Sequence, residues 1–345
     1  MPVWPIFPLL PSKSHSNHLM QCWQQRGLFA RLLLPIGWLF IALVRLRRLA
    51  YRRGWLRSRR LPVPVVVIGN LVAGGAGKTP LTLWLVQHLR ALGRKPGIVS
   101  RGYGRRDNLI QKVGAGRTAS EVGDEPLLLA QRSGCPVFVG ADRGAAADAL
   151  LSENPECDVI LCDDGLQHLR LARDVEIIVM DRRGLMNGWP LPAGPLREPA
   201  ERVSRVDALV LHNNDQIRAA GVPTFQMYLA GNEFYRLDAP NERLLPAALQ
   251  GLRLAAFAGI GEPQRFFDHL MALGLSFEPH AFPDHHRYTR ADFSFPAEAL
   301  LTTEKDALKC RGLADVPIWV LPVEAVVEPD LARFVLEKID GCTPA

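Results

Sequence analysis

Nearly the first third of this 345-residue chain has no acidic side chain, because Asp107 is its first Asp or Glu. Residues 1–106 carry 18 Lys and Arg, a local charge of +18. The rest of the chain carries 23 basic and 35 acidic residues, a local charge of −12. Such a split is typical of a chain end that meets a polyanion, either nucleic acid or an anionic membrane.

Cysteine is also scarce, and no C-x-x-C pair occurs. The six cysteines are Cys22, Cys135, Cys157, Cys162, Cys310 and Cys342. Their scatter argues against a disulfide framework or a zinc site and favours a reduced, cytosolic setting. Hydrophobic residues make up 48% and charged residues 22% of the chain, which is typical of a folded protein.

The basic segment lacks an apolar run long enough to span a bilayer comfortably. Leu32–Val44 has only 13 apolar residues, Pro35 among them, and eight arginines follow within residues 45–60. Charge that follows the apolar run, with no small-residue cleavage site, argues against a signal peptide. We expect residues 27–60 to form a helix in the membrane interface, with its arginines on anionic lipid. The alternatives are a core-covering helix with a solvated basic stretch and, less favoured beside an apolar segment, a nucleic-acid site.

Strands and helices alternate from about residue 63. Val63–Leu71 is typical of a buried strand, and Thr79–Gly93 has helical spacing and ends in glycine. Further strands are expected at Lys95–Ser100, Pro136–Gly140, Val159–Cys162, Val175–Asp181 and Ala208–His212. The alternation predicts an α/β fold in which a parallel sheet is covered on both faces. Ligands of such sheets bind at the carboxyl ends of the strands.

The stretch GNLVAGGAGKTP, residues 69–80, lies between that first strand and helix. It matches the phosphate-loop pattern G-x-x-x-x-G-K-[ST], except that Val72 stands at the entry glycine. The expected nucleotide-binding residues are Val72, Ala73, Gly74, Gly75, Ala76, Gly77, Lys78 and Thr79. Lys78 is expected to reach the β- and γ-phosphates, and the Thr79 hydroxyl to hold Mg²⁺. The alternative is a glycine-rich turn without a ligand.

The stretch VILCDDGLQH ends an apolar strand in two aspartates, Asp163 and Asp164. This pattern is typical of the acidic, metal-holding partner of a phosphate loop. The alternative is a cap on the next helix. His168 either faces the phosphates or has a structural role.

Three further motifs offer a base or a positioning group for phosphoryl transfer. The candidates are Asp124 and Glu125 in EVGDEP, His285 and His286 in FPDHHRY, and Arg197 and Glu198 in GPLREP. Each motif is also typical of a helix cap or a loop, so the residues alone leave these roles open.

Seven motifs together resemble a known family. In chain order they are PVPVVVIGNLVAGGAGKTP, SRGYGRR, GDEP, DDGLQH, LPAGPLREP, FPDHHRY and LLTTEKDALK. Over residues 25–325 this order is similar to that of tetraacyldisaccharide 4′-kinase, the lipid A kinase of Gram-negative bacteria. That family also carries a non-glycine residue at the position of Val72.

The resemblance implies that ATP, with Mg²⁺, phosphorylates the 4′-hydroxyl of a tetraacylated glucosamine disaccharide 1-phosphate. It implies two α/β/α domains with the site between them, on a peripheral or monotopic protein at the cytoplasmic face of the bacterial inner membrane. The expected division is a leader and membrane helix at 1–60, a P-loop kinase domain at 61–235, a linker at 236–251 and a smaller C-terminal α/β domain at 252–345. Neither a nucleic acid nor an obligate protein partner is expected.

By position, the resemblance makes Asp124 the base, paired with His285, and Lys78 the lysine that acts on the phosphates. Asp163 and Asp164 would serve Mg²⁺, with Glu198 as a possible helper. The residues implied for phosphates or sugar are Arg101, Arg143, His168 and Arg197.

A rival interpretation is a membrane-recruited P-loop switch ATPase with an amphipathic anchor. Such proteins resemble K-G-G-x-G-K-T, whereas Ala73 stands at the first lysine of that pattern. The missing lysine and the second-domain motif FPDHHRY both favour the kinase.

Overall fold

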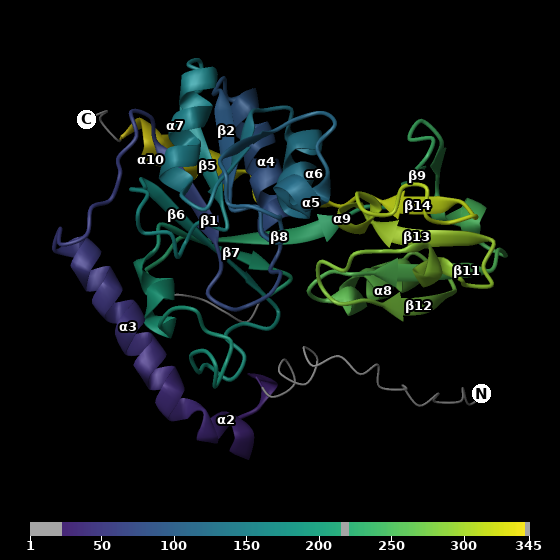
Figure 1. The fold of residues 1–345 in the computed structure, drawn as a ribbon, viewed down its shortest axis with the longest axis horizontal. Coiled ribbons are helices and arrows are strands. Elements are labelled where there is room, and N and C mark those ends of the chain that lie inside the picture. The colour runs from purple at the N-terminus through teal and green to yellow at the C-terminus, as the bar shows by residue number, and fades with distance from the viewer. Residues whose placement is uncertain (1–22, 215–220, 342–345) are drawn as a thin grey trace.

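The computed structural model describes residues 23–214 and 221–341 and shows two α/β domains with a helical segment along the larger one (Figure 1). Of the expected leader, residues 1–22 lie outside the described part of the chain. The predicted α/β class with a parallel phosphate-loop sheet is confirmed.

The larger domain is built on one sheet, which has nine strands among the described residues, in the order β15-β8-β7-β6-β1-β5-β2-β4-β3. The strands are β1 (Val65–Gly69), β2 (Pro96–Ser100), β3 (Gln111–Val113), β4 (Val137–Val139), β5 (Val159–Asp163), β6 (Val175–Asp181), β7 (Ala208–His212), β8 (Thr224–Ala230) and β15 (Glu324–Val327). The inner strands pair in parallel, and only the edge strands β3 and β15 pair antiparallel. β1 and β5 are neighbours, with Ile68 opposite Asp163, so their carboxyl ends meet at one edge.

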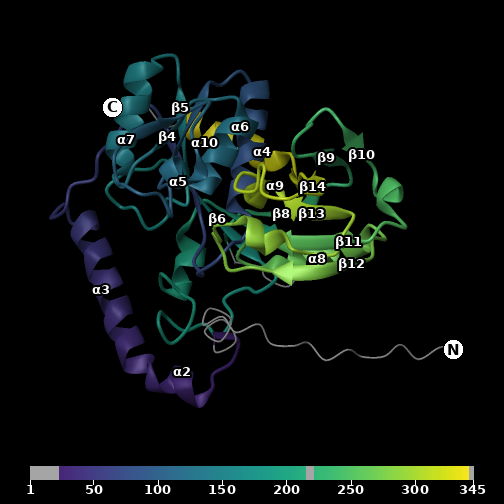
Figure 2. The same ribbon diagram turned by 45° about the vertical axis from the view of Figure 1, so that its right-hand side comes forward.

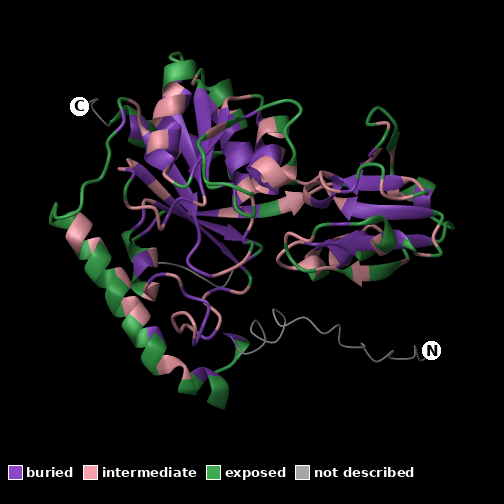
Figure 3. Ribbon diagram, in the orientation of Figure 1, coloured by how far each residue is buried: buried purple, intermediate pink, exposed green. Residues whose placement is uncertain are grey.

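Helices cover both faces of this sheet, as the run of buried Val and Ile in its central strands requires. They are α4 (Lys78–Ala91), α5 (Ala119–Val122), α6 (Asp124–Ser133), α7 (Arg143–Glu153) and α10 (Asp330–Asp340). Apolar side chains of α4, α6 and α10 form one core with the sheet, and those of α7 form the other. Figure 3 shows this buried interior against an exposed rim.

The smaller domain has a second sheet, in the order β10-β9-β14-β13-β11-β12. Its elements are β9 (Phe234–Arg236), β10 (Arg243–Leu244), β11 (Leu254–Ala258), α8 (Pro263–Ala272), β12 (Phe277–Ala281), β13 (Ala299–Thr303), α9 (Glu304–Ala307) and β14 (Ile318–Leu321). Short 3₁₀ turns of this domain lie at η2 (Pro246–Leu249) and η3 (Arg290–Phe293), and a further one, η1 (Ala200–Arg205), belongs to the larger domain. Phe266, Phe267 and Leu270 of α8 cover one face, and an aromatic cluster around Phe257 and Tyr288 covers the other.

The structure corrects the expected domain boundaries. β9 and β10 belong to the second sheet, although the expectation divided them between domain 61–235 and linker 236–251. Residues 324–340 return to the first domain as β15 and α10 instead of completing domain 252–345. The chain therefore crosses twice between domains, and the crossings are adjacent because Ala230 of β8 pairs with Glu324 of β15. Pairing between strands so distant in sequence leaves no local pattern to predict it.

Helices α2 (Leu28–Leu32) and α3 (Leu34–Arg52) run along the outside of the larger domain (Figures 1 and 2). α3 approaches the loop before η1 closely, since a Cβ on Gly37 would lie 3.2 Å from Pro190 Cγ. Its outer face is apolar and exposed; the exposed side chains of α2 and α3 include Leu28, Leu32, Ile36, Leu39, Leu43 and Leu46. In the described ranges, no helix has the length and apolar character needed to cross a membrane.

Three of the four arginines of α3 have partners within the protein. Arg45 pairs with Glu201 at 3.3 Å, Arg47 donates to the Gln167 carbonyl, and Arg48 pairs with Glu198. These three side chains therefore face the protein body.

Candidate active site

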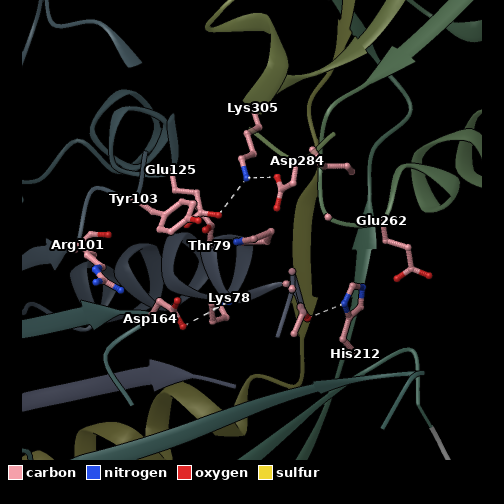
Figure 4. A pocket seen from close by; sticks show the side chains of 18 of the residues that line it. Lys78, Thr79, Arg101, Tyr103, Glu125, Asp164, His212, Glu262, Asp284 and Lys305 are labelled. Carbon is pink, nitrogen blue, oxygen red and sulfur yellow. Dashed lines mark hydrogen bonds and ion pairs between the residues drawn. The ribbon is translucent and has the colours of Figure 1, made fainter. Parts of the chain in front are cut away.

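The phosphate loop lies between β1 and α4, and donors from the protein body hold its carbonyls. Asn70 Nδ2 donates to Gly74 O at 3.0 Å, and Arg183 donates to Gly75 O at 2.7 Å. Burial lowers the pKa of His212, so its neutral Nδ1–H donates to Ala76 O at 3.1 Å (Figure 4). With these carbonyls engaged, the turn and the N-terminus of α4 present amides to an anion in the cleft.

Val72 is extended and buried, which explains why the loop entry needs no glycine. It forms a β-bridge with Leu196, and Ala73 N donates to Pro195 O at 3.0 Å. Extended backbone is open to any residue, whereas Gly77 has a φ of +96° that favours glycine. Gly74–Thr79 line the cleft. Val72 and Ala73, which we expected to bind nucleotide as well, do not line the cleft and instead contact residues 195–196.

A cleft of about 1640 Å³ lies between the two domains beside the loop. It gathers predicted site residues from distant segments: Lys78, Thr79, Arg101, Arg143, Asp164, His168, Arg197 and His285. Phe40 and Val44 of α3 also line it, as do Leu229 of β8 and Phe266 of α8 in the smaller domain.

Asp163 and Asp164 lie at the end of β5, beside the loop. Thr82 Oγ1 donates to Asp163 Oδ1 at 3.1 Å, and burial with nearby carboxylates raises the pKa of Asp163. Burial also raises the pKa of Asp164, but Lys78 at 3.6 Å and Arg197 at 3.5 Å outweigh it and lower that pKa.

These aspartates fit a magnesium site that is completed by a ligand. Asp163 Oδ2 and Asp164 Oδ1 are buried and accept no hydrogen bond, and Asp164 Oδ1 lies 3.6 Å from Lys78 Nζ, so hard oxygen donors remain beside the loop lysine. In the part of the chain that the structure describes, no three His, Cys, Asp or Glu side chains form a metal-binding group. Mg²⁺ commonly takes only one or two protein carboxylates and completes its shell with phosphates and water.

Glu198, which we expected as a metal helper, lines the cleft and has side-chain partners of its own. Arg48 and Gln167 donate to Glu198, and Arg202 Nε lies 3.4 Å from its Oε2. The side chain is only 2% exposed. Both oxygens are therefore engaged, and Glu198 joins α3 to the protein interior.

Asp124 and His285 meet across the domain boundary. His285 Nδ1 lies 3.0 and 2.9 Å from the two carboxylate oxygens of Asp124. His286, the other candidate, instead points its Nε2 to Asp292, 3.4 Å away within its own domain. Asp124 lines a smaller pocket of about 500 Å³, whereas His285 lines both this pocket and the large cleft.

Charge sets the proton affinity of this pair. Burial raises the pKa of Asp124, but the His285 hydrogen bond and two lysines outweigh it and lower the pKa to about 2. Burial lowers the pKa of His285, but the hydrogen bond and charge of Asp124 outweigh it, and the net pKa is raised. A proton that the pair binds therefore resides on the imidazole rather than on the carboxylate.

The two lysines, Lys305 and Lys309, are functional candidates that sequence reasoning missed. Their ammonium groups lie 3.9 and 3.7 Å from Asp124 Oδ2. Lys305 also bridges Glu125 at 3.3 Å and Asp284 at 3.1 Å, between the domains (Figure 4). The motif LLTTEKDALK contained both lysines, but no pattern within it relates them to GDEP.

Arg143 gives one corner of the cleft a positive charge, and His168 lies beside it. The backbone N–H of Arg143 donates to His168 Nε2 at 3.3 Å. Burial and the adjacent Arg143 lower the pKa of His168 to about 4, so the imidazole is neutral and accepts this bond. The Arg143 side chain is itself 7% exposed, which makes its charge available to a ligand rather than to bulk water.

Ion pairs fasten the domains on both sides of the cleft. Arg132 of α6 binds Glu304 of α9 through contacts of 2.6 Å. On the other side, Arg265 of α8 binds Asp181 at the end of β6, at 2.6 Å. Both pairs cross between domains, so the cleft has a defined width.

The sequence of this chain is similar to those of known kinases. A family model described as tetraacyldisaccharide-1-P 4′-kinase matches residues 29–340. The tetraacyldisaccharide 4′-kinase of Dechloromonas aromatica is 51% identical over 313 residues, which are 90% of this chain and 92% of that protein. This chain belongs to the tetraacyldisaccharide 4′-kinase family.

Other members of the tetraacyldisaccharide 4′-kinase family extend the comparison. The enzyme of Azoarcus is 49% identical over 328 residues, 93% of this chain and 95% of that protein. A crystal structure of LpxK from Aquifex aeolicus in complex with ATP has a TM-score of 0.78 and 31% identity, and covers 90% of this chain and 100% of that one. The resemblance inferred from the seven motifs is thus confirmed.

Proposed function

We propose that this protein transfers the γ-phosphoryl group of ATP to the 4′-hydroxyl of a tetraacylated glucosamine disaccharide 1-phosphate. One observation carries the proposal: the phosphate loop and His285 of the smaller domain line one cleft, and His285 is bonded to Asp124, in a chain of this family. A phosphoryl donor and a hydroxyl acceptor require both elements at a single site.

The first domain would align the phosphates. Lys78 and the turn amides bind them, and Arg101, Arg143, His168 and Arg197 surround the transferred group or the sugar. Thr79, Asp163 and Asp164 would hold Mg²⁺, which when bound neutralises charge on the phosphate oxygens. Preset positive charge of this kind stabilises the transition state because it needs no reorganisation during the reaction.

The Asp124–His285 pair would accept the proton of the sugar hydroxyl. Asp124 alone, with a pKa of about 2, is a weak base. Its hydrogen bond to His285 gives the pair a proton affinity above that of an ordinary histidine. We therefore assign the base to the pair rather than to Asp124 alone.

Helices α2 and α3 would hold the enzyme on the cytoplasmic face of the inner membrane. Their exposed apolar stripe suits insertion into the headgroup region, and Arg52 and Arg53 stay exposed for anionic lipid. The inner side of the same helix contributes Phe40 and Val44 to the cleft. A substrate whose acyl chains remain in the bilayer thus has an apolar path to the site.

Incubation with labelled ATP, Mg²⁺ and the acylated disaccharide 1-phosphate tests the proposal. The expected product is a lipid with one additional labelled phosphate, separated by chromatography. Acceptor that lacks the 4′-hydroxyl is the matched control and should take no label. Release of labelled inorganic phosphate with no labelled lipid would favour the switch ATPase instead.

A further inference from the structure

Helix α3 and the phosphate loop are joined by a chain of hydrogen bonds through the protein interior. Arg48 on α3 donates to Glu198. Gln167 Nε2 donates to Glu198 Oε1 at 3.1 Å and to Asn70 O at 3.2 Å. Asn70, which is fully buried, donates through Nδ2 to Gly74 O at 3.0 Å. This series of hydrogen bonds therefore begins on helix α3 and ends on the turn of the phosphate loop.

Backbone contacts tie the segment that carries Glu198 to the same loop. Leu196 forms the β-bridge with Val72, and Arg197 N donates to Leu71 O at 2.8 Å. The Arg197 side chain lies 3.5 Å from Asp164. A shift of this segment would move the loop entry and the ligand-facing charges together.

We infer that Arg48 is a positioning residue for the nucleotide. Arg48 lines the cleft, but its guanidinium is held by Glu198, so we assign its effect on the phosphates to the route through Gln167 and Asn70. The hydrogen bond to the Gly74 carbonyl keeps the loop amides in place for an anion. Without it the loop is more mobile and binds an anion less tightly, because ordering the loop costs conformational entropy. The inference rests on the proposed function for the identity of the nucleotide site, but nucleotide binding can be measured without the lipid substrate.

Arg45 provides a matched comparison on the same helix. It pairs with Glu201 at 3.3 Å, with both side chains more than half exposed, and such surface pairs contribute little. Gln at either position removes one positive charge from α3, so any weaker attraction to anionic vesicles is common to both variants. In Arg48→Gln, Glu198 keeps Arg202 at 3.4 Å and is not left as an unpaired buried charge.

The experiment measures binding of a fluorescent ATP analogue with Mg²⁺ and without lipid. Arg48→Gln should weaken binding roughly three- to thirtyfold, the range expected for coupling through such a network. Arg45→Gln should bind as the wild type does, and vesicle sedimentation should be equal for both. Arg48→Lys keeps the charge but not the planar fork, and should recover part of the affinity.

A double-mutant cycle tests the route. In Asn70→Ala the chain is already broken, so adding Arg48→Gln should cost little more. Equal affinities of Arg48→Gln and Arg45→Gln, or full additivity with Asn70→Ala, would overturn the inference. If Arg48→Gln unfolds at a lower temperature than the wild type, the cycle of Arg48→Lys with Asn70→Ala replaces it as the test of the route. If the variants show these binding differences but the wild type phosphorylates no lipid, the proposed function fails and this inference stands.

Discussion

The two walls of the active-site cleft are held in different ways. On the larger domain, the phosphate-binding groups are fixed by contacts within that domain, such as Asn70 to Gly74. On the smaller domain, His285 takes its place through a bond to Asp124 across the boundary. Nucleotide binding should therefore depend mainly on the larger domain, although Gly261 of the smaller domain packs against Gly75, whereas proton acceptance should depend on the two domains together.

The most damaging change to the nucleotide wall is Lys78→Ala. Removing the lysine should lower phosphoryl transfer at least about 10³-fold, because a preset charge at the transferred group is lost. Labelled-ATP turnover measures this, and analogue binding should weaken as well. Lys95→Ala, an exposed lysine beyond α4, is the control and should keep full turnover. Normal turnover in Lys78→Ala would contradict the assignment of the loop.

Changes to the proton wall should spare nucleotide binding. Asp124→Ala and His285→Ala should each lower kcat about 10²-fold, the usual contribution of a positioned base. Their double variant should be little worse than the poorer single one, because the two residues act as a unit. Binding of the ATP analogue should stay within about twofold of wild type if the walls are independent.

His286→Ala is the control for this pair, since it removes a neighbouring imidazole whose partner is Asp292. It should cost far less activity than His285→Ala. The reverse order, with His286→Ala the more harmful, would show that the structure pairs the wrong histidine with Asp124.

The dependence of kcat on pH sharpens the comparison further. The raised pKa of His285 means that the pair stays protonated above the ordinary histidine value of 6.5, so kcat should fall as pH decreases through that raised pKa. Asp124→Asn removes the partner that raises the pKa, although Lys305, which lowers it, remains; the acidic limb should shift to lower pH. The pair's contribution to stability has the same origin: it is present below pH 6.5 and is lost as pH rises through the raised pKa. An unchanged limb in Asp124→Asn would contradict the coupling.

The smallest effect is expected at the domain fastening. Arg132→Ala removes the contact with Glu304, and the misplaced smaller domain should lower kcat about tenfold while analogue binding holds. Arg117→Ala, which removes an exposed ion pair with Glu121, should change neither quantity. Loss of ATP binding in Arg132→Ala would show that the nucleotide wall also depends on domain contact.

The sequence predicts well those features that are local in the chain. The strand, glycine turn and helix around residues 69–80 follow from adjacent residues. The expected strands match β6 and β7 at both ends and differ from β2, β4 and β5 by one residue at one or both ends. Asp163 lies beside the loop because neighbouring parallel strands end at one edge, which the alternation of strands and helices already implies.

Features that depend on distant partners could not be predicted from local patterns, and the Asp124–His285 pair came only from the family resemblance. Glu198 looked like a metal helper because its partner Arg48 is 150 positions away, on a segment that we expected to face lipid. Lys305 and Lys309 stand near Asp124 only because α9 of one domain packs beside α6 of the other. Each of these contacts is long-range, and no period or motif in the sequence records it.

The apolar lining that α3 contributes to the cleft has a kinetic consequence. Phe40 and Val44 line the cleft from a helix whose other side carries the exposed stripe. On the membrane placement that we propose, substrate would enter from the plane of the bilayer. The relevant concentration is then the mole fraction of acceptor lipid in the surface. Adding inert lipid at constant total acceptor would slow turnover by surface dilution, although the bulk concentration is unchanged.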